Sequence, residues 1–260
     1  MSETYDRERP SFEDANNVTV KRCFYAYEFT IPYTQGKDVA DVGCANGYGS
    51  VEMAKTAKTV LGLDYSEATV SGNLETYRDI KNLSFRACRV PPLILEDNSV
   101  DLVTAFQFIE HIHLRLKFMQ EVKRVLKPGG VFICTTPNAK MSIARNPFHV
   151  HEYTFAEMKE EAGKVFDSFE LKGLNGNEKV NKYYEDNQTW AKRILRFDPL
   201  GLHKLIPSAL LVKPYNYLTS KMRRNLKATN TDTMNISTSD FVLQNDELDQ
   251  CWDIYLIAKK

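Results

Sequence analysis

Residues 39–50, VADVGCANGYGS, indicate how this chain folds. The apolar start of the stretch predicts a strand, and the residues from Asn46 onward predict a helix directly after it. Gly43 and Gly47 permit a tight turn between the two and let a ligand approach bare backbone. Because the first amides of a helix are unpaired, this turn has the features of the nucleotide-binding corner of a doubly wound sheet.

Strand and helix patterns alternate from residue 38 to residue 174. Ser66 is a predicted helix cap, and Thr154 with Glu157 has the spacing of a capping box. This alternation predicts an α/β fold with a mostly parallel sheet and helices on both faces. We expect an N-terminal helical cap (1–36), a core (37–175 and 249–260) closed by a last strand in CWDIYLIAKK, and a substrate-side lid (176–248) of helical or irregular structure.

Composition excludes several classes of protein. The 260 residues contain 34 basic and 34 acidic side chains, so a dedicated nucleic-acid binder is not expected. The five cysteines form no CxxC pair, which indicates reduced thiols in a cytoplasmic protein. The N-terminus predicts no signal peptide, and no apolar run is long enough to cross a membrane.

The turn favours a ligand without a pyrophosphate. A dinucleotide fingerprint that starts at Gly43 needs glycine at positions 45 and 48, where this chain has Ala45 and Tyr48. An NAD-dependent oxidoreductase is therefore disfavoured. Asp64 ends the next predicted strand about 20 residues after the turn, a position suited to binding two ribose hydroxyls.

Four motifs in order resemble those of class I S-adenosylmethionine-dependent methyltransferases: DVGCANGYG (41–49), GLDYS (62–66), EDNSVDLVTAFQFIEHI (96–112) and EVKRVLKPGGVFICTTPN (121–138). The resemblance implies a seven-stranded Rossmann-like sheet whose last strand is antiparallel. It implies that the Gly43–Gly47 turn wraps the amino-acid part of S-adenosylmethionine, with Asp41 behind it and Asp64 on the ribose. Arg89 stands near the place where many relatives have an acid for the adenine, so backbone around Cys88–Val90 is expected to bind it instead. The expected cofactor-binding residues are Asp41, Gly43, Cys44, Ala45, Gly47, Asp64, Tyr65, Cys88, Arg89, Val90, Phe106 and Gln107.

The acceptor is expected at the carboxyl ends of the fourth and fifth predicted strands. If the acceptor is a hydroxyl, a base must remove its proton, and the candidate bases are His111, then His149 and His151. His149 and His151 would share a face on an extended segment. Some quinone O-methyltransferases of this superfamily carry an E-x-x-E-H metal motif, but Gln107 replaces its first Glu, so no metal is expected. The expected substrate-binding residues are Glu110, Asn138, Glu152, Tyr153, Arg223 and Arg224.

The identity of the acceptor stays open between several classes. The stretch from Asn146 to Leu171 resembles methyltransferases found with surface-polysaccharide synthesis, which implies O-methylation of a sugar or of a nucleotide- or lipid-linked glycan. A quinone- or lipid-type small molecule is the alternative, as is a non-catalytic cofactor-binding subunit. Residues 199–231 contain six basic residues and no acid, which fits a solvated cap, a surface for an anionic acceptor or a peripheral membrane contact. The oligomeric state cannot be predicted.

Overall fold

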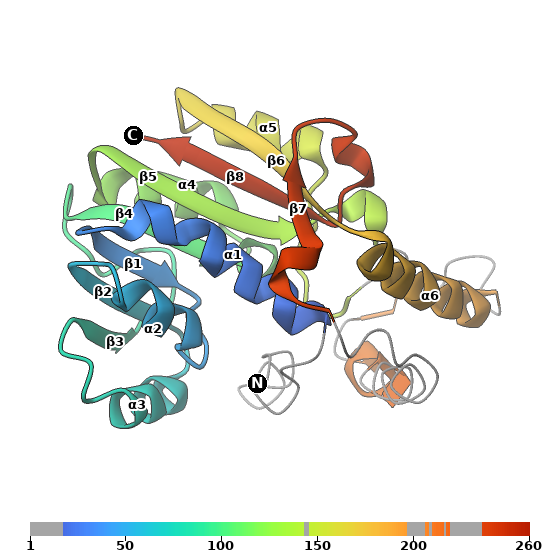
Figure 1. Cartoon of the computed structure of the whole chain (residues 1–260), viewed down its shortest axis with the longest axis horizontal. Coiled ribbons are helices and arrows are strands. Elements are labelled where there is room, and N and C mark those ends of the chain that lie inside the picture. Colours follow the sequence, from blue (N-terminus) through green and yellow to red (C-terminus); the bar gives the residue numbers. More distant parts are fainter. Residues whose placement is uncertain (1–17, 143–145, 197–205, 208–209, 216, 219–235) are drawn as a thin grey trace.

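A single mixed sheet organises the protein. The computed structural model describes residues 18–142, 146–196, 206–207, 210–215, 217–218 and 236–260. The sheet has eight strands in the order β3-β2-β1-β4-β5-β8-β6-β7 (Figure 1). The strands are β1 (Asp38–Val42), β2 (Thr59–Asp64), β3 (Leu83–Ala87), β4 (Val100–Phe106), β5 (Leu126–Pro137), β6 (Ser168–Gly176), β7 (Phe241–Gln244) and β8 (Asp253–Lys259). The main helices are α1 (Val18–Thr34), α2 (Tyr48–Ala54), α3 (Glu67–Thr76), α4 (Arg115–Val125), α5 (Phe155–Gly163) and α6 (Glu178–Leu195).

The strand directions confirm the predicted fold class. Strands β1 to β5 pair in parallel, and β8 runs antiparallel between β5 and β6. The predicted count of seven strands is wrong, because β7 pairs with the end of β6 and adds an eighth strand. This four-residue strand lies within a polar stretch, where its alternation is too short to predict a strand from the sequence. Its buried Phe241 lies 6.0 Å from the ring of Tyr25, which holds the strand against α1.

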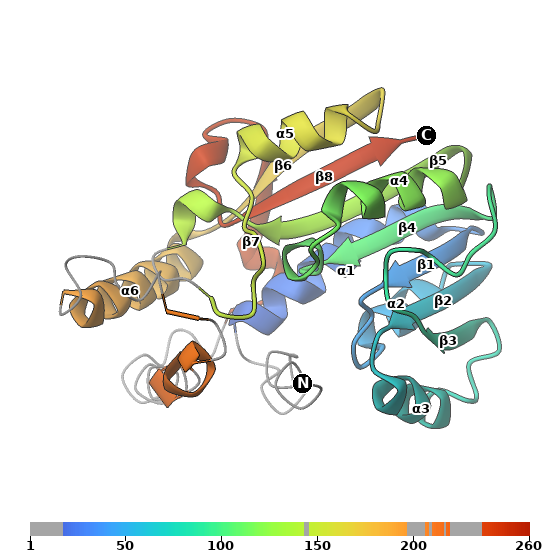
Figure 2. The same ribbon diagram turned by 180° about the vertical axis from the view of Figure 1, so that it is seen from behind.

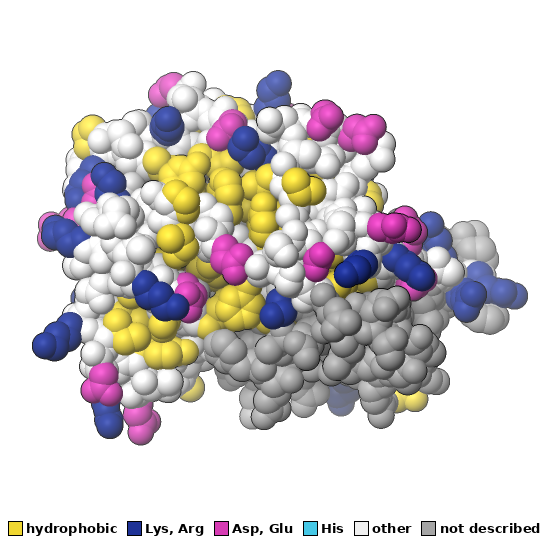
Figure 3. Space-filling model, viewed as in Figure 1, with side chains coloured by type: hydrophobic (Ala, Val, Ile, Leu, Met, Phe, Trp, Pro, Cys, Tyr) yellow, Lys and Arg dark blue, Asp and Glu magenta, His cyan; other side chains and the backbone are white. Residues whose placement is uncertain are grey.

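Helices cover both faces of the sheet. Helices α1 and α2 lie on the face seen in Figure 1, and α4 and α5 lie on the opposite face (Figure 2). Beside α1, apolar side chains gather over β5 and β8 (Figure 3). The predicted caps are present: Ser66 accepts a hydrogen bond from the amide of Thr69, and Thr154 with Glu157 forms a capping box.

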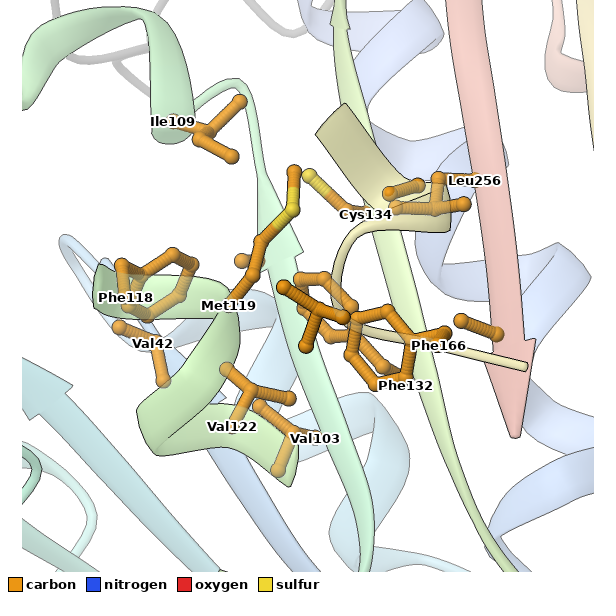
Figure 4. Packing of buried hydrophobic residues seen from close by; sticks show 14 of the residues in the cluster. Val42, Val103, Ile109, Phe118, Met119, Val122, Phe132, Cys134, Phe166 and Leu256 are labelled. Carbon is orange, nitrogen blue, oxygen red and sulfur yellow. The ribbon is translucent and has the colours of Figure 1, made fainter. Parts of the chain in front are cut away.

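The larger of the two main cores lies between the sheet and α4. Phe118, Met119 and Val122 of α4 are fully buried against Val103 and Phe132 of the sheet (Figure 4). Each such side chain contributes about 1.5–3 kcal/mol by leaving water. This packing fixes β4 and β5, so the loops at their carboxyl ends start from rigid positions. Among the described residues, no helix combines the length and the apolar composition that crossing a bilayer requires.

Candidate functional site

The turn after β1 has the conformation that its glycines predict. Gly43 and Gly47 have φ values of +77° and +74°, in the left-handed region. A Cβ atom at Gly43 would lie 2.5 Å from Cδ2 of Phe108, and one at Gly47 would lie 2.8 Å from Cζ of Phe85. Both positions therefore require glycine for the backbone conformation and for space. Ala45 between them also has a positive φ, +47°.

Asp41 lies behind this turn. Its carboxylate accepts hydrogen bonds from Ser50 Oγ (2.6 Å), Thr104 Oγ1 (2.8 Å) and the hydroxyl of Tyr27 (3.4 Å). Burial raises the pKa of Asp41 to about 6, although these three hydrogen bonds oppose the rise. Asp41 thereby joins β1 to β4, α1 and α2 underneath the turn.

Asp64 connects the turn to the end of β2. One of its carboxylate oxygens accepts from the amide of Ala45 (3.1 Å), and the other accepts from the amide of Ser66 (2.9 Å). Since a carboxylate accepts about four hydrogen bonds, Asp64 can hold the turn and bind ribose hydroxyls at the same time.

Helix α3 supports the same turn through two side chains that were not predicted. Asn73 Nδ2 donates to the carbonyl of Ala45 (2.7 Å), and the hydroxyl of Tyr77 donates to the carbonyl of Asn46 (3.1 Å). Asn73 is buried, although its sequence neighbours Gly72 and Leu74 are exposed. A polar residue within a helix gives no signal in the sequence that it is buried.

The residues expected near the adenine differ in their exposure to solvent. Cys88 is buried, and its amide already donates to the carbonyl of Asp64 (2.8 Å). Arg89 is exposed, Val90 packs at the edge of the core, and Tyr65 is 37% exposed directly after Asp64. Cys44 is buried inside the turn.

The end of β4 turns toward α1. Phe106 is buried with its ring edge against Tyr27, at 4.8 Å between centroids. Gln107 has a φ of +49°, which is uncommon outside glycine and is a form of strain found at functional sites. Its amide donates to the carbonyl of Thr135 (2.9 Å), and its Oε1 accepts from Arg22 Nη2 (3.4 Å).

Glu110 and His111 follow in a short 3-10 helix, Ile109–His111. Glu110 is fully buried, and its Oε2 accepts from Thr136 Oγ1 (3.0 Å). Its Oε1 has no hydrogen-bond partner among the described residues and lies 4.0 Å from Nε2 of His111. His111 Nδ1 lies 3.2 Å from the carbonyl oxygen of Phe148, so the opposite nitrogen faces the Glu110 carboxylate.

His149 joins this group, whereas His151 does not. The rings of His111 and His149 meet edge to face at 4.9 Å, and Nδ1 of His149 lies 2.6 Å from Oε1 of Glu152. Burial alone would raise the pKa of Glu152, but its hydrogen bond with His149 lowers it. His151 instead packs on Tyr153. The two histidines contact different rings, and the segment is not extended here: Val150 lies in a bend, and the amides of Val150 and His151 both donate to the carbonyl of Glu110.

These side chains form a possible cation site. Glu110, His111 and His149 each offer one ligand atom, and the three atoms lie within 4.8 Å of one another. Carboxylate and imidazole groups suit several divalent metals. The expectation of no metal, which came from Gln107, therefore stays a prediction to be tested.

The other expected acceptor residues have different surroundings. Asn138 is buried, and its Nδ2 donates to the carbonyls of Cys251 (2.9 Å) and Asp249 (3.2 Å). The buried Tyr153 has its hydroxyl between Glu161 and Nε of Arg115. Both side chains hold loops in place. Arg223 and Arg224 lie outside the described residues.

Comparisons with known proteins agree with this geometry. A family model described as a methyltransferase domain matches residues 34–190. A probable S-adenosylmethionine-dependent methyltransferase of Mycolicibacterium smegmatis is 40% identical over 149 residues, which cover 55% of this chain and 57% of that protein. A ubiquinone biosynthesis O-methyltransferase of Acinetobacter baumannii is 32% identical over 124 residues, which cover 46% of this chain and 48% of that protein. The chain thus spans about half the length of these curated relatives.

A solved structure extends the comparison to the whole fold. The crystal structure of the YcgJ protein from Bacillus subtilis superposes with a TM-score of 0.57 at 15% identity, over 91% of this chain and 97% of that one. At this identity the likeness shows the fold alone. The family model, however, covers more than half of the sequence. The chain therefore belongs to the methyltransferase-domain family, within the class I S-adenosylmethionine-dependent group.

Proposed function

We propose that this protein transfers a methyl group from S-adenosylmethionine to a hydroxyl oxygen of a sugar or of a nucleotide- or lipid-linked glycan. The observation that supports transfer to oxygen is the hydrogen bond of His111. Its Nδ1 lies 3.2 Å from the carbonyl oxygen of Phe148, and a carbonyl can only accept. Nδ1 therefore carries the proton, and the lone pair on Nε2 is left to take a proton from the acceptor.

The other residues position the reactants and stabilise charge. When bound, S-adenosylmethionine supplies an electrophilic methyl group. In the proposal, the turn from Gly43 to Gly47 holds its amino-acid part and Asp64 binds its ribose. The Glu110 carboxylate, 4.0 Å from Nε2 of His111, stabilises the imidazolium that forms when His111 takes the proton. The remaining contribution of the chain is orientation of donor and acceptor.

Kinetics of matched histidine variants test this function. Wild-type protein is incubated with isotope-labelled S-adenosylmethionine and a panel of methyl glycosides, nucleotide sugars and quinols, and the methylated atom is identified by mass spectrometry and NMR. His111→Ala is expected to lower kcat by ~10²–10⁴ with little change in cofactor affinity. The exposed His113 provides the control, since His113→Ala should leave kcat unchanged. Near wild-type rates for the alanine variants of His111, His149 and His151 would contradict base catalysis.

A quinone- or lipid-type acceptor is the second candidate. Two observations favour it: the likeness to the ubiquinone biosynthesis O-methyltransferase, and the grouping of Glu110, His111 and His149. Methylation of a quinol but of no sugar in the same panel would select this candidate. Cofactor binding without turnover of any compound would indicate a non-catalytic subunit. The role of the basic residues 199–231 toward an anionic acceptor or a membrane, and a cytoplasmic location, also stay predictions.

A further inference from the structure

Buried polar atoms without partners occur on elements that meet at one end of the sheet. Five such side-chain atoms occur among the described residues: Arg22 Nε, Glu110 Oε1, Tyr184 OH, Asn187 Oδ1 and Asp253 Oδ1. Folded proteins pair nearly all of their buried polar groups, so each of these atoms requires an explanation. We call these five residues the polar cluster.

The members of the polar cluster come from distant parts of the chain. Arg22 lies near the start of α1, Glu110 follows β4, Tyr184 and Asn187 lie on α6, and Asp253 begins β8. All of these elements meet where β4 and β5 end, as both views of the ribbon show (Figures 1 and 2). This is the edge at which an open α/β sheet binds its ligands.

Arg22 and Asp253 form the centre of the polar cluster. Nε of Arg22 lies 3.2 Å from Oδ2 of Asp253, close enough for an ion pair but not aligned as a hydrogen bond. Nη2 of Arg22 donates to Oε1 of Gln107 (3.4 Å). The side chain of Asp253 is only 2% exposed, and burial raises its pKa to about 6; Arg22 and the side chain of Gln107 oppose this rise, and Glu110 adds to it.

Two stacked aromatic rings, those of Tyr184 and Trp252, lie beside this ion pair. The guanidinium of Arg22 lies 5.7 Å from the centre of the Tyr184 ring, which stacks on Trp252 at 4.2 Å. Nε1 of Trp252 donates to Oδ1 of Asn181, one turn before Tyr184 on α6 (2.9 Å). This hydrogen bond fixes the orientation of the Trp252 ring.

The unpartnered atoms indicate what kind of group they would bind. Arg22 Nε is a donor, the Tyr184 hydroxyl can donate or accept, and the oxygens of Glu110, Asn187 and Asp253 accept. An ammonium group only donates, and a phosphate or carboxylate only accepts, whereas a hydroxyl does both. The polar cluster contains one guanidinium and two carboxyl groups, so it has no surplus positive charge for an anion.

We propose that the polar cluster is the acceptor subsite and that it binds an uncharged ring with several hydroxyl groups, placed against Tyr184 and Trp252. This inference rests on the proposed function, and it adds the residues that select the acceptor. Glu110 belongs to the polar cluster and also neighbours His111, so a ring bound there has one hydroxyl beside the base. Arg22, Tyr184 and Asp253 bind the acceptor and take no part in the proton transfer.

Binding can be measured separately from turnover. Saturation-transfer NMR on the full chain with S-adenosylhomocysteine uses the methyl α-glycosides of glucose, mannose and rhamnose as probes, with choline and glucose 1-phosphate as charged comparisons. At least one glycoside is expected to bind. Asp253→Asn and the milder Tyr184→Phe should each weaken it tenfold or more. Asp167→Asn, at a side chain that is 97% exposed, is the matched control and should change its affinity less than twofold.

Calorimetry with S-adenosylhomocysteine shows that each variant is folded, since its affinity should stay within twofold of wild type. Equal glycoside binding by wild type and both cluster variants overturns the inference, as does binding of only choline or only glucose 1-phosphate. If wild type methylates a glycoside and His111→Ala does not, while the cluster variants bind it normally, the inference fails and the proposed function stands. If the polar cluster binds a glycoside that is never methylated, the proposed function fails instead.

Discussion

Replacing Asp64 by alanine is expected to weaken the binding of S-adenosylmethionine at least tenfold. Asp64 is 6% exposed, and the amides of Ala45 and Ser66 fix its carboxylate at the end of β2. Hydrogen bonds to a charged group contribute about 1.5–3 kcal/mol each, so losing two ribose hydroxyls costs about 3 kcal/mol at the lower bound. This loss of binding free energy corresponds to roughly a hundredfold weaker affinity. Water that enters the vacated site recovers part of the loss, so the expected effect is at least tenfold.

Isothermal titration calorimetry with S-adenosylmethionine and S-adenosylhomocysteine measures this loss. Asp64→Asn keeps one acceptor oxygen in place and should fall between wild type and Asp64→Ala. The control is Glu67→Gln, which removes an equal charge from an exposed side chain in the first turn of α3 and should leave affinity within twofold. Unchanged affinity in Asp64→Ala, or tighter binding of NAD than of S-adenosylmethionine, would refute the assigned role of Asp64.

Three further predictions concern metal, pH and packing. Treatment with EDTA should leave methyl transfer unchanged; a loss that magnesium or zinc restores would assign a metal to Glu110, His111 and His149. Burial raises the pKa of Asp41 from 3.8 to about 6, so its protonated form is favoured in the folded state and the contribution of Asp41 to stability falls as pH rises from 4 to 6. Relative to Asp41→Asn, wild type should lose about 3 kcal/mol of its free energy of unfolding between pH 4 and pH 6, measured by urea unfolding. An equal pH dependence of the two proteins would show that the Asp41 carboxyl is not the titrating group. Phe118→Ala should lower the free energy of unfolding by about 3–5 kcal/mol, and a loss below 1 kcal/mol would contradict the close packing of α4.

Local chemistry made much of the site predictable. The glycine turn, the acid that ends β2 and the caps at Ser66 and Thr154 each depend on residues within a few positions of one another. Their backbone requirements appear directly in the residue types, because few other residues adopt the same conformations. The parallel strand order then follows from the rules for strand–helix–strand units.

Contacts between distant segments could not be predicted in the same way. Arg22 and Asp253 are 231 positions apart and meet only because α1 starts where β8 starts. Neither has a neighbour in the sequence that indicates its partner. A distant contact also decides the arrangement of His149 and His151. Their spacing predicts a shared face only if the segment is extended, but the segment bends where the amides of Val150 and His151 donate to the carbonyl of Glu110.

Two buried aspartates show which feature distinguishes a binding position from a structural one. Burial raises the pKa of both Asp41 and Asp253 to about 6, so the shift alone does not separate them. Hydroxyl groups of the fold occupy both oxygens of Asp41, and these three hydrogen bonds make that carboxylate part of the turn's support. Asp253 has one oxygen without a hydrogen-bond partner among the described residues, at the edge where the elements that carry four other such atoms meet. A ligand can supply the missing hydrogen bonds of a rigidly held group, and this makes Asp253, but not Asp41, a residue of the proposed acceptor subsite.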